Sequence, residues 1–487
     1  MKAKLHPYQE LAKRFVLTRP RSGLFMECGT GKTLVTLSAL EELKSPHHTL
    51  VIAPKLVAMT SWTEEIAKWD IQLNPVVIAG LEKKDRHKLY KEIPNYPPSI
   101  FFINQENVVD LVENTDRWYF RNVVVDEMHK FKSATARRFQ ALRAVSPYVE
   151  RLIGLTGTPQ PNGLMDLWAE IFLLDHGYRL GMSINQYREW FFFPDEHSII
   201  NNRVTNWIPK YGAEQEIHRR LQGLVLSIKN TPLNLPSINY IDHVIPLDKK
   251  EKDLYNKFVK EKVLAFDEHD KNVPVEDQEA VAFIPATNAG VKTLKLWQMS
   301  SGALYKPIDL REQRADFYQI HTKKLDYLES LLETVDGNVI VFYNFQSDVV
   351  MLEQRLKDLG YAPYDESLPA DKLNYAIFDK SVRIKNAFAE KKINVLLMQP
   401  KAGGIGINIQ TGGHTAIWYT IPIQLDDYIQ ANTRLHRQGQ THPVFIHHLL
   451  IKDTIDEHFR RKLTAKEESQ QALMDATDKF LENPIIA

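Results

Sequence analysis

The sequence predicts an α/β protein with two domains, each built on a parallel sheet. Short apolar runs, bounded by polar turns, recur at 50–53, 100–103, 123–125 and 152–155. Because these runs are continuous rather than alternating, they are typical of strands that are buried on both faces, as in a parallel sheet. The segments 33–43 and 61–68 have helical patterns, and repeated alternation of strand and helix indicates an α/β domain.

The same pattern restarts in the second half of the chain. Apolar runs recur at 339–342, 395–398, 416–419 and 444–451. The stretch 347–359 has helical spacing, with Ser347 or Asp348 as its cap and Gly360 as its stop. Between about 176 and 321 the sequence is aromatic, charged and interrupted by prolines, which indicates helical insertions. We therefore expect a first domain at 1–240 with a helical insertion at about 176–230, a helical connection at 241–320, and a second domain with a C-terminal helix at 321–487.

Length and composition narrow the class of protein. A chain of 487 residues exceeds one ordinary hydrophobic core, and 44% hydrophobic with 25% charged residues is typical of a packed soluble protein. The 61 basic and 61 acidic residues balance, so any contact with nucleic acid must be local. The single cysteine, Cys28, excludes an internal disulfide framework and favours a reducing compartment. Neither a secretory signal nor a membrane-spanning run is present in the sequence, so we expect a cytoplasmic protein.

A phosphate-binding loop is predicted where an apolar run meets a helical segment. Its residues are Cys28, Gly29, Thr30, Gly31, Lys32 and Thr33. Glycines let backbone N–H groups curve around phosphates, the helix start adds positive potential, and the lysine supplies a cation. The Thr33 hydroxyl would hold Mg²⁺. The strict pattern has a further glycine where this chain has Met26, so a purely structural loop is the alternative.

Two carboxylates directly follow the apolar run at 123–125. At the carboxyl end of a parallel strand, Asp126 can hold the outer shell of a metal ion and Glu127 can polarise the attacking water. Such a pair taken alone is more often a solvated turn, but a preceding phosphate loop favours the catalytic roles. His129 either couples this site to the second domain or caps the turn.

Together with the segment 155–159 (LTGTP), these motifs resemble those of helicase-like ATPases of superfamily 2, in the same order and over nearly the whole chain. The resemblance implies two tandem RecA-like lobes that use ATP and Mg²⁺. It also implies that Gln9, in a segment similar to the adenine-recognition element, hydrogen-bonds the base. Lys55 and Trp62 lie in segments similar to the motif by which the first lobe touches a nucleic-acid strand.

Two stretches of the second domain resemble the Swi/Snf branch of this superfamily. They are 401–408 (KAGGIGIN) and 430–440 (QANTRLHRQGQ). In the first stretch, the resemblance implies nucleic-acid contacts for Lys401 and Gly403 and a nucleotide contact for Gly406. In the second, Arg434 and Arg437 are three residues apart, so we expect them on one helix face, as arginine fingers for phosphates bound by the first lobe.

One further segment of the second domain resembles a family motif that contacts the nucleic-acid backbone. Asn344 follows the predicted strand at 339–342, where related proteins meet that backbone. For Lys55 and Lys401 a solvated charge is the favoured alternative, and for Trp62 a position in the core is favoured over a stacked base.

The resemblance implies an ATP hydrolase that translocates on double-stranded DNA without obligatory strand separation. Phosphate contacts carry no base information, so binding is expected to be independent of DNA sequence and sensitive to salt. A strand-separating DNA or RNA helicase and a catalytically weak DNA clamp are the alternatives. The compact arrangement resembles phage or prophage members, so we expect a monomer in the cytoplasm of a bacterial or phage-infected cell, or in the nucleus if the source is eukaryotic.

Overall fold

The computed structural model describes residues 4–27, 29–161, 163–195, 198–200, 203–204, 206–228, 235–261, 263–266, 282–285, 289–306, 316–401 and 409–478. The chain forms two compact units. Unit 1 contains the described residues within Met1–Asn234 and those from Lys466 onward, and unit 2 contains the described residues within Leu235–Gly403 and Ile407–Ala465. Within these described ranges, no helix is long and apolar enough to cross a membrane.

Unit 1 is built on a seven-stranded sheet in which every neighbouring pair is parallel. In spatial order its strands are β11 (Val225–Ile228), β1 (Arg21–Met26), β6 (Arg151–Thr156), β5 (Phe120–Asp126), β2 (His48–Ala53), β4 (Ile100–Asn104) and β3 (Pro75–Val77). The four strands predicted in the first half are therefore confirmed as β2, β4, β5 and β6.

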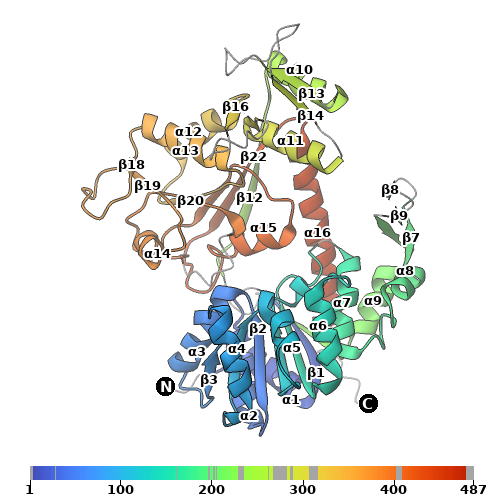
Figure 1. The fold of residues 1–487 in the computed structure, drawn as a ribbon. Helices are drawn as coiled ribbons and strands as arrows, with labels where there is room; N and C mark the ends of the chain where they lie inside the picture. The colour runs from blue at the N-terminus through green and yellow to red at the C-terminus, as the bar shows by residue number, and fades with distance from the viewer. Residues whose placement is uncertain are drawn as a thin grey trace. The chain divides into compact units, whose positions relative to one another are not determined.

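Helices cover this sheet on both faces (Figure 1). The helices of unit 1 are α1 (Pro7–Thr18), α2 (Lys32–Leu43), α3 (Trp62–Lys68), α4 (Lys83–Glu92), α5 (Val108–Glu113), α6 (Arg137–Val145), α7 (Leu167–Asp175), α8 (Ile184–Phe191) and α9 (Ala213–Leu221), of which α8 packs against α7 and β7. Short antiparallel pairs follow α8: β7 (Phe192–Pro194) with β10 (Trp207–Pro209), and β8 (Ile199–Ile200) with β9 (Arg203–Val204).

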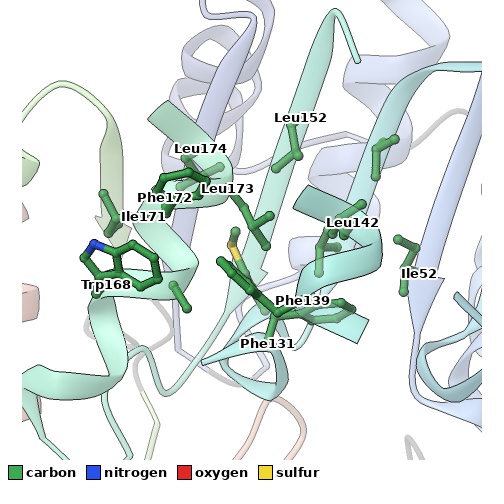
Figure 2. Packing of buried hydrophobic residues seen from close by; sticks show 14 of the residues in the cluster. Ile52, Phe131, Phe139, Leu142, Leu152, Trp168, Ile171, Phe172, Leu173 and Leu174 are labelled. Carbon is green, nitrogen blue, oxygen red and sulfur yellow. The ribbon is translucent and has the colours of Figure 1, made fainter. Parts of the chain in front are cut away.

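The buried faces of the sheet explain why its strands are continuously apolar. Side chains alternate along a strand, so Val123 and Val125 enter one hydrophobic cluster and Val124 enters another. The first cluster includes Phe139 and Trp168, shown from close by in Figure 2. Because both faces are buried here, the run Val123–Val125 is continuously apolar, and polar residues lie toward the ends of the strand at Arg121, Asn122 and Asp126.

Unit 2 contains a second seven-stranded sheet, again parallel at every pairing. Its spatial order is β12 (Ile238–Ile245), β22 (Val444–Ile451), β21 (Thr415–Trp418), β17 (Val339–Phe342), β20 (Val395–Met398), β19 (Asn374–Ile377) and β18 (Ala362–Pro363). The predicted strands at 339–342, 395–398 and 444–451 coincide with β17, β20 and β22, and β21 begins one residue earlier than predicted. The expected fold class, two α/β lobes with parallel sheets, is confirmed.

The other elements of the second half are mainly helical. The helices are α10 (Lys249–Glu261), α11 (Ala289–Ser301), α12 (Lys323–Thr334), α13 (Gln346–Asp358), α14 (Val382–Ala389), α15 (Leu425–Asn432) and α16 (Ile455–Asp478). Two antiparallel pairs accompany them, β13 (Val263–Phe266) with β14 (Ala282–Pro285) and β15 (Ala303–Tyr305) with β16 (Phe317–Gln319). The predicted helix at 347–359 is α13. The predicted caps, Ser347 and Asp348, are wrong, because both lie inside the helix; the N-cap is Phe345, whose N–H donates to the Asp348 carboxylate at 3.1 Å.

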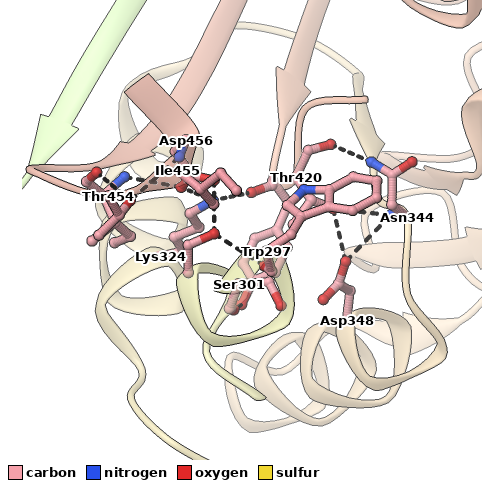
Figure 3. A network of polar contacts seen from close by, with 12 residues as sticks. Trp297, Ser301, Lys324, Asn344, Asp348, Thr420, Thr454, Ile455 and Asp456 are labelled. Carbon is pink, nitrogen blue, oxygen red and sulfur yellow. Dashed lines mark hydrogen bonds and ion pairs between the residues drawn. The ribbon is translucent and has the colours of Figure 1, made fainter. Parts of the chain in front are cut away.

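A buried ion pair joins three helices of unit 2 (Figure 3). The Lys324 Nζ of α12 lies 2.7 Å from the Asp456 carboxylate of α16 and donates to the Tyr419 carbonyl at 2.9 Å. The Ser300 hydroxyl of α11 donates to the same carboxylate at 2.8 Å. Both charged side chains are fully buried, so each depends on the other to compensate for lost hydration.

Lys324→Met is therefore expected to lower the free energy of unfolding of unit 2 by about 3–5 kcal/mol, because it leaves a buried carboxylate without its cation. Urea unfolding of the full chain, followed by tryptophan fluorescence, measures the change. Lys323→Met is the matched control, since the adjacent Nζ lies 3.5 Å from Asp248 at the surface and its loss should cost about 1 kcal/mol or less. Equal midpoints for the two variants would contradict this account.

Candidate functional site

The predicted phosphate loop connects β1 to α2 in unit 1. Gly29 and Gly31 both have a φ of 85°, in the left-handed region that favours glycine. A Cβ at Gly31 would also lie 2.5 Å from the Gln9 amide nitrogen, so both backbone and space require glycine there. Cys28 lies outside the described residues. The loop thus has the curvature predicted for a loop that wraps phosphates with its backbone.

Lys32 is the first residue of α2 and folds back onto this loop. Its Nζ donates to the Met26 carbonyl at 2.8 Å and lies 3.4 Å from the Glu27 carbonyl. The Thr30 hydroxyl also donates to Glu27, at 2.6 Å, and Thr33 follows in the first turn of α2. The predicted cation and the predicted Mg²⁺ ligand are therefore held where the loop meets the positive end of a helix.

Gln9 connects α1 to the same loop. Its Nε2 donates to the Thr30 carbonyl at 3.0 Å, and its Oε1 accepts the His6 N–H at 2.9 Å. The Tyr8 hydroxyl donates to the same Thr30 carbonyl at 3.3 Å. The residue expected to recognise adenine is thus hydrogen-bonded to the phosphate loop in this structure.

Asp126 ends β5, so its side chain lies at the carboxyl edge of the sheet. Its Oδ2 accepts the Trp62 indole N–H at 3.2 Å, and its Oδ1 accepts the Glu127 N–H at 3.0 Å. Burial and the adjacent Glu127 raise the pKa of the Asp126 carboxyl, whereas the nearby Lys32 cation and the Trp62 bond lower it. The structure therefore brings Lys32, Asp126 and Glu127 together.

Glu127 has a φ of 50°, an uncommon backbone conformation for a residue other than glycine. Its carboxylate lies 3.4 Å from the Nδ1 of the buried His129. The same Nδ1 is 3.1 Å from the Thr156 hydroxyl, which also accepts the Thr158 N–H. His129 therefore connects Glu127 to the segment 155–159 within unit 1.

That segment is in turn held by the last part of α16. Gln160 donates through Nε2 to the Ser469 carbonyl at 2.7 Å, and Gln470 donates to the Gly157 carbonyl at 3.3 Å. Leu473 is fully buried in the hydrophobic cluster of unit 1. The sequence did not predict these contacts. Helical spacing indicates a C-terminal helix, but it does not show which surface that helix packs against.

The residues expected to contact nucleic acid have different environments. Lys55 is exposed just after β2, and Lys401 is exposed after β20. Asn344 donates through Nδ2 to the Thr420 carbonyl at 2.7 Å (Figure 3), so that N–H is used inside unit 2. Gly403 and Gly406 lie outside the described residues.

Trp62 has an exposed fraction of 0%. A side chain without exposed surface cannot stack on a base, so the structure supports the core position for Trp62 rather than a contact with nucleic acid. Its indole N–H instead reaches Asp126. Gln105, which the sequence did not single out, also reaches this residue, donating through Nε2 to the Asp126 carbonyl at 2.8 Å. The sequence signal that could have pointed to Gln105 was its place as a polar residue directly after the strand at 100–104.

Arg434 and Arg437 do not lie on a helix. We expected them on one helix face, but α15 ends at Asn432 and both arginines follow it in turns. The buried Gln440 side chain explains this local structure, because its Nε2 donates to the carbonyls of Leu435, Gln410 and Gly413 at 2.9–3.2 Å. Arg434 is buried and Arg437 is half-buried.

Comparison with known proteins places both halves of the chain in families. The SNF2-related domain matches residues 8–289, and the helicase conserved C-terminal domain matches residues 323–439. Putative protein p41 of Acyrthosiphon pisum secondary endosymbiont phage 1 is 30% identical over 493 residues, which cover 96% of this chain and 98% of that protein.

Relatives from cellular organisms have lower sequence identity to this chain and are longer proteins. The DNA repair and recombination protein RAD54B of Mus musculus is 24% identical over 93% of this chain and 53% of its own length. The putative ATP-dependent helicase/translocase YwqA of Bacillus subtilis is 24% identical over 97% of this chain and 49% of its own length. This chain thus spans about half the length of these two proteins.

Among solved structures, the Sulfolobus solfataricus SWI2/SNF2 ATPase core in complex with dsDNA is 20% identical, with 99% of this chain and 96% of that chain covered and a TM-score of 0.42. The family assignment rests on the sequence matches, of which the SNF2-related domain alone covers more than half of the chain. The chain belongs to the SNF2-related family, within the Swi/Snf branch of helicase superfamily 2, and is an ATP hydrolase.

Proposed function

We propose that this protein couples Mg²⁺-dependent ATP hydrolysis to translocation on double-stranded DNA, without obligatory strand separation. The observation that supports it most directly is the grouping of the phosphate loop, Asp126 and Glu127 at one edge of the unit 1 sheet in a chain of this family. The names of relatives, which include a helicase/translocase and a DNA repair protein, favour DNA as the partner.

The roles in hydrolysis follow from the chemistry of the side chains. Lys32 neutralises charge on the phosphates, and Glu127 polarises the attacking water. Thr33 and Asp126 present oxygen atoms, which are the ligands that Mg²⁺ prefers, and the ion supplies charge neutralisation at the phosphates. Gln9 recognises adenine.

The nucleotide also requires groups from the second half of the chain. We propose that Arg434 and Arg437 stabilise charge that develops in the transition state, and that Gly406 contacts the nucleotide. Arginine suits this role because its planar guanidinium can donate two parallel hydrogen bonds to phosphate oxygens.

Contacts with DNA would be made mainly to phosphates. Lys55 and Lys401 are exposed cations, and Asn344 and Gly403 are proposed to meet the backbone. Because the whole chain carries no formal net charge, the attraction must come from such local groups, and binding should weaken as salt rises.

Duplex DNA is expected to stimulate ATP hydrolysis more than single-stranded DNA or RNA of equal length. Steady-state rates with each nucleic acid measure this. A translocase that does not separate strands should displace a third strand from a triplex but not a labelled strand from a blunt duplex. Robust unwinding of the duplex would favour the helicase instead, and duplex binding without stimulation would favour a clamp.

A further inference from the structure

Three hydrogen bonds fix the position of Asp126, and two of them come from side chains far away in the sequence. Trp62 Nε1 donates to Oδ2 at 3.2 Å, and Gln105 Nε2 donates to the backbone carbonyl at 2.8 Å. The third donor, the Glu127 N–H, holds Oδ1 at 3.0 Å. Both carboxylate oxygens and the carbonyl therefore have a defined partner.

The two side-chain donors are themselves buried. Trp62 is fully buried, with its ring centroid 6.1 Å from that of Phe102. It is the first residue of α3, directly after a π-helical turn at Val57–Ser61, a feature frequent at functional sites. Gln105 is also buried and follows β4, the strand that carries Phe102.

The indole can act on this carboxylate only as a donor. An indole N–H has no acceptor atom, so the Trp62 bond orients one Asp126 oxygen, while the Glu127 N–H orients the other. The two donors therefore fix the orientation of the carboxylate.

We infer that Trp62 and Gln105 are positioning residues that hold the Asp126 carboxylate for the metal ion of the nucleotide. This inference rests on the proposed function, in which Asp126 is a Mg²⁺ ligand. Partners that orient a ligating carboxylate typically change metal affinity by about 10–100-fold when they are removed. The role of Trp62 is thus in the ATP site and not at the nucleic acid.

If the bond served only to pair the indole N–H, the expected result would differ, because a buried tryptophan usually finds a hydrogen-bond acceptor. Trp69 allows the comparison, since it follows α3 and its Nε1 donates to the Glu65 carboxylate at 2.6 Å. If the only role of the bond were to give the indole N–H an acceptor, Trp62→Phe and Trp69→Phe would affect nucleotide binding alike.

The test is calorimetric titration of the full-length chain with ADP, at a series of Mg²⁺ concentrations and with Mg²⁺ removed by chelation. Trp62→Phe is expected to raise the Mg²⁺ concentration for half-maximal enhancement of ADP affinity by about 10–100-fold. ADP affinity without Mg²⁺ should change by about twofold or less, since the phosphate loop is intact. Trp69→Phe should behave as the parent protein.

Two further variants separate positioning from a general loss of structure. Gln105→Leu removes the second anchor and should shift the Mg²⁺ dependence in the same direction. Adding Trp62→Phe to Asp126→Asn should cause no additional loss, because both changes act through one carboxylate. Thermal unfolding of each variant shows whether the fold is retained.

An unaltered Mg²⁺ dependence in Trp62→Phe would overturn the inference, and so would equal losses of ADP affinity with and without Mg²⁺. If Trp62→Phe fails to fold, the Mg²⁺ dependence of ADP affinity in Gln105→Leu becomes the test. The same two outcomes in that variant would overturn the inference. Failure of the proposed function is distinguishable, because the parent protein itself would then show no Mg²⁺-dependent ADP binding or no stimulation by duplex DNA.

Discussion

Arg437→Ala is expected to lower the DNA-stimulated rate of ATP hydrolysis by about 10³-fold or more, while the affinity for ATP changes little. An arginine finger meets charge that develops in the transition state, so its loss lowers turnover without removing much ground-state binding. Steady-state turnover at saturating DNA, measured beside nucleotide affinity, tests this. Arg437→Lys should restore little activity, because an ammonium cannot reproduce the planar fork of donors.

The matched control for this variant is Arg383→Ala. Arg383 is an exposed arginine on α14 of the same unit, with its guanidinium 5.9 Å from the Tyr364 ring centroid. Its replacement should leave turnover unchanged. Hydrolysis at the parent rate in Arg437→Ala would show that this arginine does not act on the transition state, and the proposed coupling of the two lobes by the nucleotide would fall with it.

Lys32→Ala should lower ATP turnover by about 10²–10³-fold, a loss typical of removing one charge-stabilising group from an active site. The structure supports this expectation, because Lys32 Nζ lies inside the phosphate loop, 2.8 Å from the Met26 carbonyl. Binding to duplex DNA should persist, since the proposed DNA contacts are other residues. Turnover and DNA affinity are measured on the same preparation.

Glu127→Gln provides the comparison, because it should keep nucleotide bound while hydrolysing it slowly. The two variants therefore differ in nucleotide affinity, which Lys32→Ala lowers and Glu127→Gln retains. Unchanged turnover in Lys32→Ala would contradict the assignment of the phosphate loop. If Glu127→Gln bound no nucleotide, the division of roles between Asp126 and Glu127 would be wrong.

Local patterns were sufficient to predict most of the sheet strands. Each strand of a parallel sheet buries both faces, so the apolar run at 123–125 carries its own signal, and the structure places its alternate residues in two clusters. The curvature of the proposed phosphate loop was also predictable, since Gly29 and Gly31 are required by a backbone conformation that is decided within a few residues.

The arginines near the end of the chain show where local reasoning fails. No glycine or proline lies between Asn432 and Gln438, so the sequence offers no clear signal that α15 ends at Asn432. The Gln440 amide holds the following turns through the carbonyls of Leu435, Gln410 and Gly413. Such bonds depend on segments that meet only after folding.

By itself the sequence determined the α/β class of both lobes and the family, and it supplied the proposed chemical groups of the ATP site, because apolar periodicity and short motifs are local properties. Only the tertiary structure decided that Trp62 faces Asp126 rather than nucleic acid, and that Gln105 supports the same residue. The physical reason is that a hydrogen bond between residues 64 positions apart is set by the packing of α3 against the sheet, which no local pattern encodes.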